Sequence, residues 1–426
     1  MRWFIALLLY RLILPLLFIA AFPGWLIKML RRDGLGTGLL ERIGIYSDAD
    51  EFEPFEAVHI HAVSVGETLL ALKLIREWRE RSPEQAFVVA LGTATGHRVA
   101  TQAGIKDLRV TYAPLDMRWM VRRYLARFQP SKVVLIEGEV WPHLLMACEN
   151  RGIAATLVNA RVSPRSARRF RAFAPWIRPL YSRLRAVAIQ ELQDASLWRE
   201  LGVPAERIQH TGSLKFDPGS GEPPNTRPEF ASILELYSSG RPLVLAASTH
   251  PGENAWIAST LSKELPDIII AVAPRHAEKR QEVLQELKQA GLSGVLRSLL
   301  KVSSPSLQNE VLVIDSTGEL KDWTSHADVV IIGKSFLSQG GQNPCEAIQA
   351  RKPVIFGPHM ENFQPLCSKL LDAEGALLAC DAQQLAEAVN KALDARCATL
   401  FARNASQVLQ VHMGATGRII DLIEGP

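Results

Sequence analysis

The sequence predicts an α/β protein in which two Rossmann-like domains, each built on a doubly wound parallel sheet, follow an N-terminal membrane anchor helix. Three observations carry this prediction. The chain has 426 residues, which exceeds the size at which a single hydrophobic core usually stops growing. Two series of short apolar runs alternate with amphipathic stretches, and a polar segment rich in proline and glycine, residues 217–227, separates the two series.

The apolar runs have the length of buried strands, and a helical stretch follows each run, as in parallel βαβ units. They cover residues 57–65, 86–91, 132–136, 155–158 and 186–189, and then 243–247, 268–273, 311–314, 329–332 and 354–356. We therefore expect an anchor at residues 1–32 and domains at residues 33–220 and 221–426. Two such sheets place a ligand in a cleft where the carboxyl ends of both sets of strands converge, which is the GT-B arrangement.

The N-terminal segment, residues 3–30, is almost entirely apolar, although Arg11, Pro15 and Pro23 interrupt it. Its clean part, residues 12–27, is at the short limit for a spanning helix, so a tilted span and an in-plane anchor both stay open. A cleaved signal peptide is disfavoured because no small-residue cleavage pattern follows the run. Positive residues crowd the end of the run, which places the rest of the chain in the cytoplasm.

Composition excludes several classes of protein. With 47% hydrophobic and 22% charged residues, the chain is neither disordered nor a multi-span membrane protein. The net charge of +4 is too small for a nucleic-acid-binding protein without a recognisable motif. The basic cluster between Arg161 and Arg171 is either a solvated helix face or a surface for anionic lipid. Five widely spaced cysteines indicate a reducing compartment and no structural zinc.

In the second half, glycines and a proline follow the strand at residues 329–332, in the segment Gly340 to Glu346. Glycine lets the backbone approach a phosphate, and Pro344 suits the first turn of a helix, whose free N–H groups bind anions. Glu346 could accept hydrogen bonds from ribose hydroxyl groups. The alternative is a plain loop with a helix cap.

Other strands of the second half also end in polar residues. Pro274 and Arg275 follow the strand at residues 268–273, and an arginine there can clamp a phosphate through two hydrogen bonds. Thr317, Gly318 and Glu319 follow the strand at residues 311–314. Strand ends of one parallel sheet lie at the same edge, so these residues predict one anion-binding site, although a surface salt bridge also explains Arg275.

In the first half, two strand ends and the segment just before the polar break carry candidate catalytic groups. Glu67 follows the first strand and could take a proton from an acceptor hydroxyl group as a general base, or could simply be a helix-start carboxylate. Glu137 and Glu139 follow the strand at residues 132–136, which is unusual for capping alone. Lys215 stands just before the polar break, where it could stabilise developing negative charge.

Two motifs suggest other functions. His59 and His61 alternate on one strand, but no third metal ligand accompanies them, and a strand histidine is more often packed or hydrogen bonded. The segment from Gly92 to His97 resembles a phosphate loop but lacks the Lys-Ser/Thr pair of a Walker motif. We therefore expect no metal site at the histidines, and a turn or an acceptor-binding loop at residues 92–97 in place of a nucleoside triphosphate loop.

At this point the residues are similar to those of a known family. Ten segments, in order, resemble those of bacterial 3-deoxy-D-manno-octulosonic acid (Kdo) transferases: HIHAVSVGE, YAPLD, EGEVWPHLL, NARVSPRSARRF, GSLKFD, AASTHPGE, VAPRH, STGEL, GGQNPCEA and FGPHMENF. The similarity covers nearly the whole chain, including an N-terminal anchor. The family usually has histidine where this chain has Gln342.

The resemblance implies a GT-B fold, CMP-Kdo as donor and an inverting displacement without cofactor or metal. A lipid A precursor would be the acceptor, and the enzyme would sit on the cytoplasmic face of the bacterial inner membrane, in contact with its lipid. Glu67 would be the base, and Glu137 and Lys215 would stabilise the transition state. Positions implied to bind CMP are Pro274, Arg275, Thr317, Gly318, Glu319, Asn343, Pro344, Cys345 and Glu346.

Two other functions stay open from the sequence. Another GT-B enzyme that uses a UDP-sugar, either a transferase or a UDP-GlcNAc 2-epimerase, would share the same arrangement. A catalytically inactive membrane scaffold would bind lipid without turnover, although the presence of both Glu67 and Arg275 argues against it.

Overall fold

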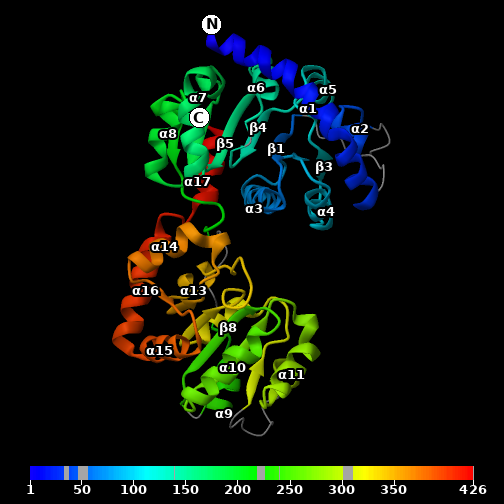
Figure 1. Cartoon of the computed structure of the whole chain (residues 1–426). Helices are drawn as coiled ribbons and strands as arrows, with labels where there is room; N and C mark the ends of the chain where they lie inside the picture. Colours follow the sequence, from blue (N-terminus) through cyan, green and yellow to red (C-terminus); the bar gives the residue numbers. More distant parts are fainter. Residues whose placement is uncertain are drawn as a thin grey trace. The chain divides into compact units, whose positions relative to one another are not determined.

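The fold was described from a computed structural model, in which residues 1–32, 38–46, 56–138, 140–217, 226–238, 240–300 and 310–425 are described. The chain forms two compact units, Met1–Gly219 with Gly414–Pro426, and Ser220–Met413. Each unit contains one parallel sheet flanked by helices (Figure 1). The expected pair of Rossmann-like domains is therefore confirmed.

The sheet of the first unit has the strand order β3-β2-β1-β4-β5-β6-β7, and all its strands are parallel. Its order reverses between β1 and β4, which makes that pair the topological switch point. The strands are β1 (Val58–Ala62), β2 (Phe87–Leu91), β3 (Leu108–Tyr112), β4 (Lys132–Ile136), β5 (Ala154–Ala160), β6 (Ala186–Ile189) and β7 (Ile208–His210).

Helices cover both faces of this sheet because alternate strand residues point to opposite sides. Apolar residues of α3, α4 and α17 pack on one face, and those of α5, α6, α7 and α8 pack on the other. The helices are α1 (Arg2–Arg32), α2 (Gly38–Arg42), α3 (Val65–Arg81), α4 (Ala94–Gln102), α5 (Arg118–Phe128), α6 (Pro142–Glu149), α7 (Pro164–Tyr181), α8 (Ala195–Glu200) and α17 (Ala415–Glu424).

The second sheet has the order β10-β11-β9-β8-β12-β13-β14 and is also parallel. Its strands are β8 (Leu243–Thr249), β9 (Ile269–Pro274), β10 (Gly294–Leu296), β11 (Val311–Val313), β12 (Val329–Ile332), β13 (Val354–Phe356) and β14 (Leu377–Leu378). Its helices are α9 (Pro228–Ser238), α10 (Glu253–Glu264), α11 (Arg280–Gln289), α12 (Leu320–His326), α13 (Cys345–Gln349), α14 (Gln364–Asp372), α15 (Ala382–Leu393) and α16 (Ala395–Gln410). Helices α10, α11 and α15 pack their apolar residues on one face.

The C-terminal residues do not belong to the domain in which we expected them. The second domain was expected to extend to residue 426, but α17 packs in the first unit, where Ile419, Ile420 and Ile423 join the core beside α3. The buried carboxylate of Asp217 holds this return, because it accepts hydrogen bonds from the Thr416 backbone N–H at 2.8 Å and the Thr416 hydroxyl at 2.6 Å. A short amphipathic helix gives no sequence indication of which sheet it covers.

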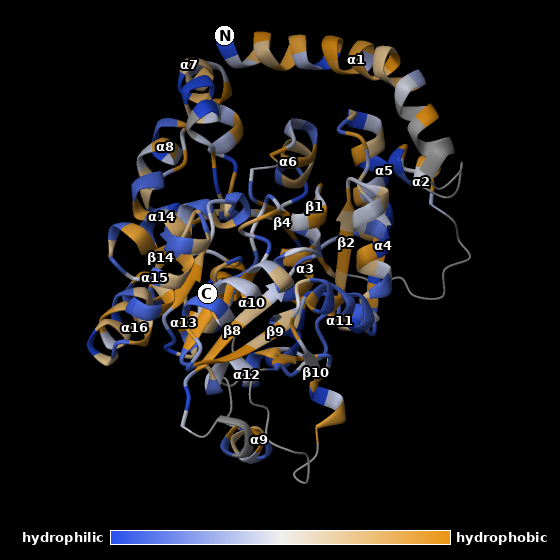
Figure 2. Cartoon of the chain, turned by 60° about the horizontal axis from the view of Figure 1, so that its bottom comes forward, coloured by the Kyte–Doolittle hydropathy of each residue, from blue (hydrophilic) through white to orange (hydrophobic). Residues whose placement is uncertain are grey.

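Helix α1 continues through Pro15 and Pro23 as one helix, and Figure 2 shows that it is apolar over much of its length. Its segment Arg2–Gly24 is long and apolar enough to cross a membrane, with a mean hydropathy of 2.4, and 6% of that segment is buried. Part of α1 nevertheless lies against the first unit: Leu7 is buried, and α1 contacts α7.

Candidate active site

The switch point of the first sheet brings two acidic residues together. Strands β1 and β4 are neighbours, with His61 opposite Leu135, and both run toward the same edge. Glu67 lies in the first turn of the helix that follows β1, and Glu137 directly follows β4. Of the two acids expected after β4, Glu139 lies outside the described residues.

Glu67 and Ser64, the N-cap residue of α3, together cap the start of this helix. The Ser64 hydroxyl donates to Glu67 Oε1 at 2.8 Å, and the Val63 backbone N–H donates to Oε2 at 2.8 Å. The Glu67 backbone N–H donates back to Ser64 Oγ at 3.2 Å. The side chain is only 7% exposed, so these bonds hold one carboxylate geometry at the strand end. Glu67 is thus a buried carboxylate that caps the start of α3.

Glu137 has an unusual backbone for a residue with a side chain, with φ at +63°. Such strain persists where surrounding structure enforces it, and here the Glu137 backbone N–H donates to the Val158 carbonyl at 2.9 Å. Withdrawal from water raises the pKa of the Glu137 carboxyl group, and the charge of Glu67 raises it further. The positive charges of Arg161 and Lys215 act in the opposite direction on the same pKa. Glu67, Glu137 and Lys215 therefore share one electrostatic site.

Lys215 is positioned by a residue whose role the sequence analysis missed. The side chain of Asn159 is buried at the end of β5, with φ at +52°. Its Oδ1 accepts from the Leu214 backbone N–H at 2.9 Å and from the Ser213 hydroxyl at 3.3 Å. Through these bonds Asn159 holds the loop that carries Lys215 against the end of β5. A polar residue inside an apolar strand was the available indication.

In the second unit, Arg275 and Glu346 lie close enough to interact. Arg275 follows β9, and its backbone N–H donates to the Thr249 carbonyl of neighbouring β8 at 3.0 Å. Although Glu346 is exposed as a whole residue, partial burial of its carboxyl group raises the pKa. The positive charges of Lys321 and Arg275 lower the same pKa. The side chain of Arg275 is exposed and free to meet an anion in this setting.

The segment before Glu346 is a tight loop followed by a helix of five residues, α13, which begins at Cys345 and follows Pro344. The side chain of Asn343 accepts from the Cys345 backbone N–H at 3.0 Å, so one of the N–H groups expected to meet an anion is already satisfied. Cys345 itself is buried. The start of this short helix therefore attracts an anion more weakly than the start of a long helix would.

Gln342, which stands where the family usually has histidine, connects this loop to the end of β8. Its Nε2 lies 3.3 Å from His250 Nε2, at the end of β8. Gly340 and Gly341 have positive φ values, +116° and +67°. A side chain at Gly341 would come within 2.4 Å of the Met360 sulfur, so only glycine fits there.

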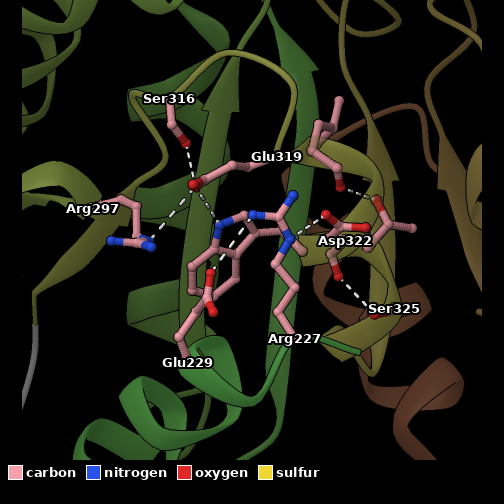
Figure 3. Close-up of polar contacts among 10 residues, drawn as sticks. Arg227, Glu229, Arg297, Ser316, Glu319, Asp322 and Ser325 are labelled. Atoms are coloured by element: carbon pink, nitrogen blue, oxygen red, sulfur yellow. Dashed lines mark hydrogen bonds and ion pairs between the residues drawn. The ribbon is translucent and has the colours of Figure 1, made fainter. Parts of the chain in front are cut away.

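Glu319 takes part in a network inside the second unit (Figure 3). Its carboxylate accepts from the Ser316 hydroxyl at 2.5 Å and from the Trp323 indole N–H at 3.4 Å, and Arg297 lies 3.7 Å away. Thr317 and Gly318 are exposed beside it, and Gly318 has φ at +86°. Among the described residues no hydrogen bond or ion pair joins Glu319 to Arg275 or Glu346. The structure therefore ties the Glu319 carboxylate to the start of α12.

Glu253 organises two strand-end loops, and the sequence analysis did not single it out. The residue is fully buried at the start of α10. Its carboxylate accepts from the backbone N–H groups of His250 at 3.0 Å, Lys334 at 2.5 Å and Phe336 at 3.1 Å. One carboxylate thus connects the ends of β8 and β12, the two strands at the switch point of the second sheet. The available indication was an acid three residues after His250.

The strand histidines are packed side chains. Burial lowers the pKa of His59 to about 3 and that of His61 to about 4, so both are neutral at physiological pH. His59 Nδ1 lies 2.7 Å from the Tyr124 hydroxyl, and the His61 ring contacts Trp141 edge to face. In the part of the chain that the structure describes, no group of three or more His, Cys, Asp or Glu side chains could hold a metal ion.

The basic cluster between Arg161 and Arg171 divides in the structure. Arg161 contributes to the electrostatics of Glu137, whereas Arg171 forms an ion pair with Glu200 at 2.8 Å on the surface. The two side chains are 49% and 44% exposed, so this pair contributes little to stability.

Comparison with solved structures agrees with the fold described above. The crystal structure of Acinetobacter baumannii MurG aligns with a TM-score of 0.53 and 12% identity, covering 87% of this chain and 99% of that chain. A glycotransferase of kitacinnamycin aligns with a TM-score of 0.51 and 13% identity, covering 86% of this chain and 98% of that chain. At these identities the likeness concerns the fold alone, and it confirms the GT-B class.

Sequence relatives define the family. Residues 37–218 match the family described as 3-Deoxy-D-manno-octulosonic-acid transferase (kdotransferase). The 3-deoxy-D-manno-octulosonic acid transferase of Haemophilus influenzae is 30% identical over 395 residues, which are 91% of this chain and 90% of that one. The transferase of the same name from Bordetella pertussis is 33% identical over 388 residues, 86% of each chain. With this identity along most of its length, the chain belongs to the 3-deoxy-D-manno-octulosonic acid transferase family and is a glycosyltransferase.

Proposed function

We propose that this enzyme transfers Kdo from CMP-Kdo to a lipid A precursor, lipid IVA, in lipopolysaccharide biosynthesis. The observation that carries the proposal is the shared electrostatic site of Glu67, Glu137 and Lys215 in a chain of this family. The first unit would bind the acceptor and the second unit the donor. We expect the protein at the cytoplasmic face of the bacterial inner membrane, with α1 in contact with its lipid and no nucleic acid as partner.

The reaction we propose is a single inverting displacement. The acceptor hydroxyl oxygen attacks the anomeric carbon of Kdo as the bond from that carbon to the CMP phosphate oxygen breaks. Glu67 takes the hydroxyl proton, and CMP leaves with the bonding electron pair. Burial of Glu67 and the fixed direction of its carboxylate support this role, because a general base must lie within reach of one proton.

Glu137 and Lys215 would act on charge that develops during the displacement. Lys215 carries a positive charge near the two carboxylates, so it can offset negative charge at the acceptor oxygen. Burial and the charge of Glu67 raise the pKa of the Glu137 carboxyl group, whereas Arg161 and Lys215 lower it, so this group would respond to charge that develops beside it.

The donor half of the proposal places CMP in the second unit. Arg275 is exposed, and its guanidinium can hold the leaving phosphate through two charge-assisted bonds. Glu346 is the candidate for the ribose hydroxyl groups, and the segments 317–319 and 343–345 would enclose the nucleotide. Because Arg275 can meet the charge on the leaving group, we propose that the reaction needs no metal and no cofactor.

The experiment is transfer from CMP-Kdo, generated in place, to tetraacylated lipid A precursor, followed by mass spectrometry. A mass gain of one or more Kdo units that is absent with Glu67→Gln would support the proposal. No gain with folded wild-type protein, together with a melting shift by UDP-GlcNAc and none by CMP, would exclude it.

A further inference from the structure

A basic pocket lies beside α1 in the first unit. It has a volume of about 420 Å³, and its polar lining comes from Arg11 on α1, Arg118 and Arg122 on α5, His143 and Asn150 around α6, and Arg151 just after α6. No carboxylate lines it. Four guanidinium groups from three separate segments of chain therefore converge on one space.

One of the residues that line this pocket lies beside a carboxylate, because His143 Nδ1 is 3.7 Å from Asp116 Oδ2. Among the described residues, no ion pair involves any of its four arginines. Arg118 and Arg122 lie four residues apart on α5, where like charges repel and destabilise a helix. A bound anion would relieve this repulsion, and a guanidinium fork matches the geometry of a phosphate.

Two carboxylates that lie next to lining residues already have partners. Asp116 is buried and accepts from the Tyr10 hydroxyl at 2.8 Å and from the backbone N–H groups of His143 and Leu144, each at 2.8 Å. Glu149 forms an ion pair with Arg183 at 2.8 Å. The pocket therefore presents donors to its ligand and no competing acceptor charge.

The position of the pocket points to a ligand at a membrane surface. The contact of Tyr10 with Asp116 and that of Arg11 with His143, at 3.4 Å, fasten this part of α1 to the first unit. Other residues of α1 stay exposed although they are apolar, such as Leu12 at 58% and Leu16 at 65%. A helix fastened along its side, with its apolar residues free, suits insertion in the plane of the interface. Arg11 belongs to both α1 and the pocket, so the pocket would lie at the level of lipid headgroups.

We propose that this pocket binds the phosphate group of an anionic membrane lipid and holds α1 in the plane of the membrane interface. The proposal does not depend on Kdo transfer. It assigns a ligand to residues that have no part in the proposed catalytic or donor sites.

The test uses the full chain in neutral detergent, titrated with phosphatidylglycerol or diacylglycerol and followed by native mass spectrometry. We expect one phosphatidylglycerol to bind, and the double change Arg118→Ala with Arg122→Ala to weaken this binding about tenfold or more, because two cationic contacts with the phosphate are lost. The matched control, Arg396→Ala with Arg403→Ala on α16, removes the same charge from exposed positions and should retain binding.

Equal loss in both double variants would show diffuse attraction to charge and overturn the proposal, as would no loss in either. Equal binding of diacylglycerol, which lacks phosphate, would overturn it too. Inorganic phosphate should compete only weakly, and competition at the concentration of the lipid would reassign the pocket to a free anion. Donor and acceptor are absent from these measurements, so their outcome is independent of the proposed transfer.

Discussion

Replacing Glu253 tests whether one buried carboxylate holds the strand-end loops of the second unit. Three backbone N–H groups donate to it, from residues 250, 334 and 336. In Glu253→Ala all three lose their acceptor, at about 1–3 kcal/mol for each buried group, or roughly 3–9 kcal/mol together. That sum approaches the whole stability of a domain, so this variant is expected to unfold the second unit.

Glu253→Gln is the more informative change. Its amide oxygen can still serve the two N–H groups that meet Oε2, but its NH₂ group cannot accept from Phe336. The loss of one hydrogen bond to a charged acceptor costs about 1.5–3 kcal/mol. In a domain of this size, each kcal/mol lowers the melting temperature by about 2–4 °C, so we expect a fall of about 3–12 °C.

The assay combines calorimetry with hydrogen exchange of the backbone amides at residues 334 and 336. The control is Glu264→Gln at the other end of α10, where the side chain is 50% exposed and the expected change is within about 0.5 kcal/mol. If Glu253→Gln has the same melting temperature as the wild type and both amides stay protected from hydrogen exchange, Glu253 does not hold these loops.

Four further predictions concern the catalytic and donor groups. Glu67→Gln should lower the transfer rate by about 10²–10⁴-fold. Ser64→Ala removes the cap and one hydrogen bond to the Glu67 carboxylate but keeps the carboxylate itself, so it should cost about 0.5–2 kcal/mol of stability and lower the rate far less; equal rates in both variants would remove Glu67 as the base. Because the pKa of Glu137 is raised in the folded chain, its ionised form disfavours folding. The free energy of unfolding of the wild type, relative to that of Glu137→Gln, should therefore be greatest below the ordinary pKa of 4.5 and fall as pH rises through the raised pKa. Urea unfolding at several pH values measures this difference, and a difference that does not change with pH contradicts the shift. Arg275→Ala should weaken CMP binding about 10- to 150-fold by calorimetric titration, with Lys288→Ala on α11 as an exposed control that binds normally. Treatment with EDTA should leave the transfer rate unchanged, and recovery of a lost rate by an added divalent cation would show that the reaction needs a metal.

The sequence alone predicted the central strands of both sheets. Strands β2 and β12, for example, are continuous apolar runs because both of their faces are buried, and such burial is visible in the residue types. The four strands that were not predicted, β3, β7, β10 and β14, all lie at sheet edges. Edge strands are short or only partly buried here, so they show no continuous apolar run.

The candidate catalytic residues were also predictable in part. Glu67 and Glu137 were recognised because each follows a predicted strand, and parallel strands end at the same edge. The two residues lie in one electrostatic site because β1 pairs with β4. The order of the strands is set by helix packing and not by the residues of either strand.

By itself, the sequence determined the fold class, the strand ends that carry polar groups, the apolar N-terminal helix and the family resemblance. Each of these is recorded in local periodicity or in contiguous motifs. Only the tertiary structure decided that α17 returns to the first unit, that Glu253 and Asn159 hold functional loops, and that arginines from α1 and α5 meet in one pocket. These features join residues far apart in the chain, and hydrogen bonds between such residues leave no periodic pattern in the sequence.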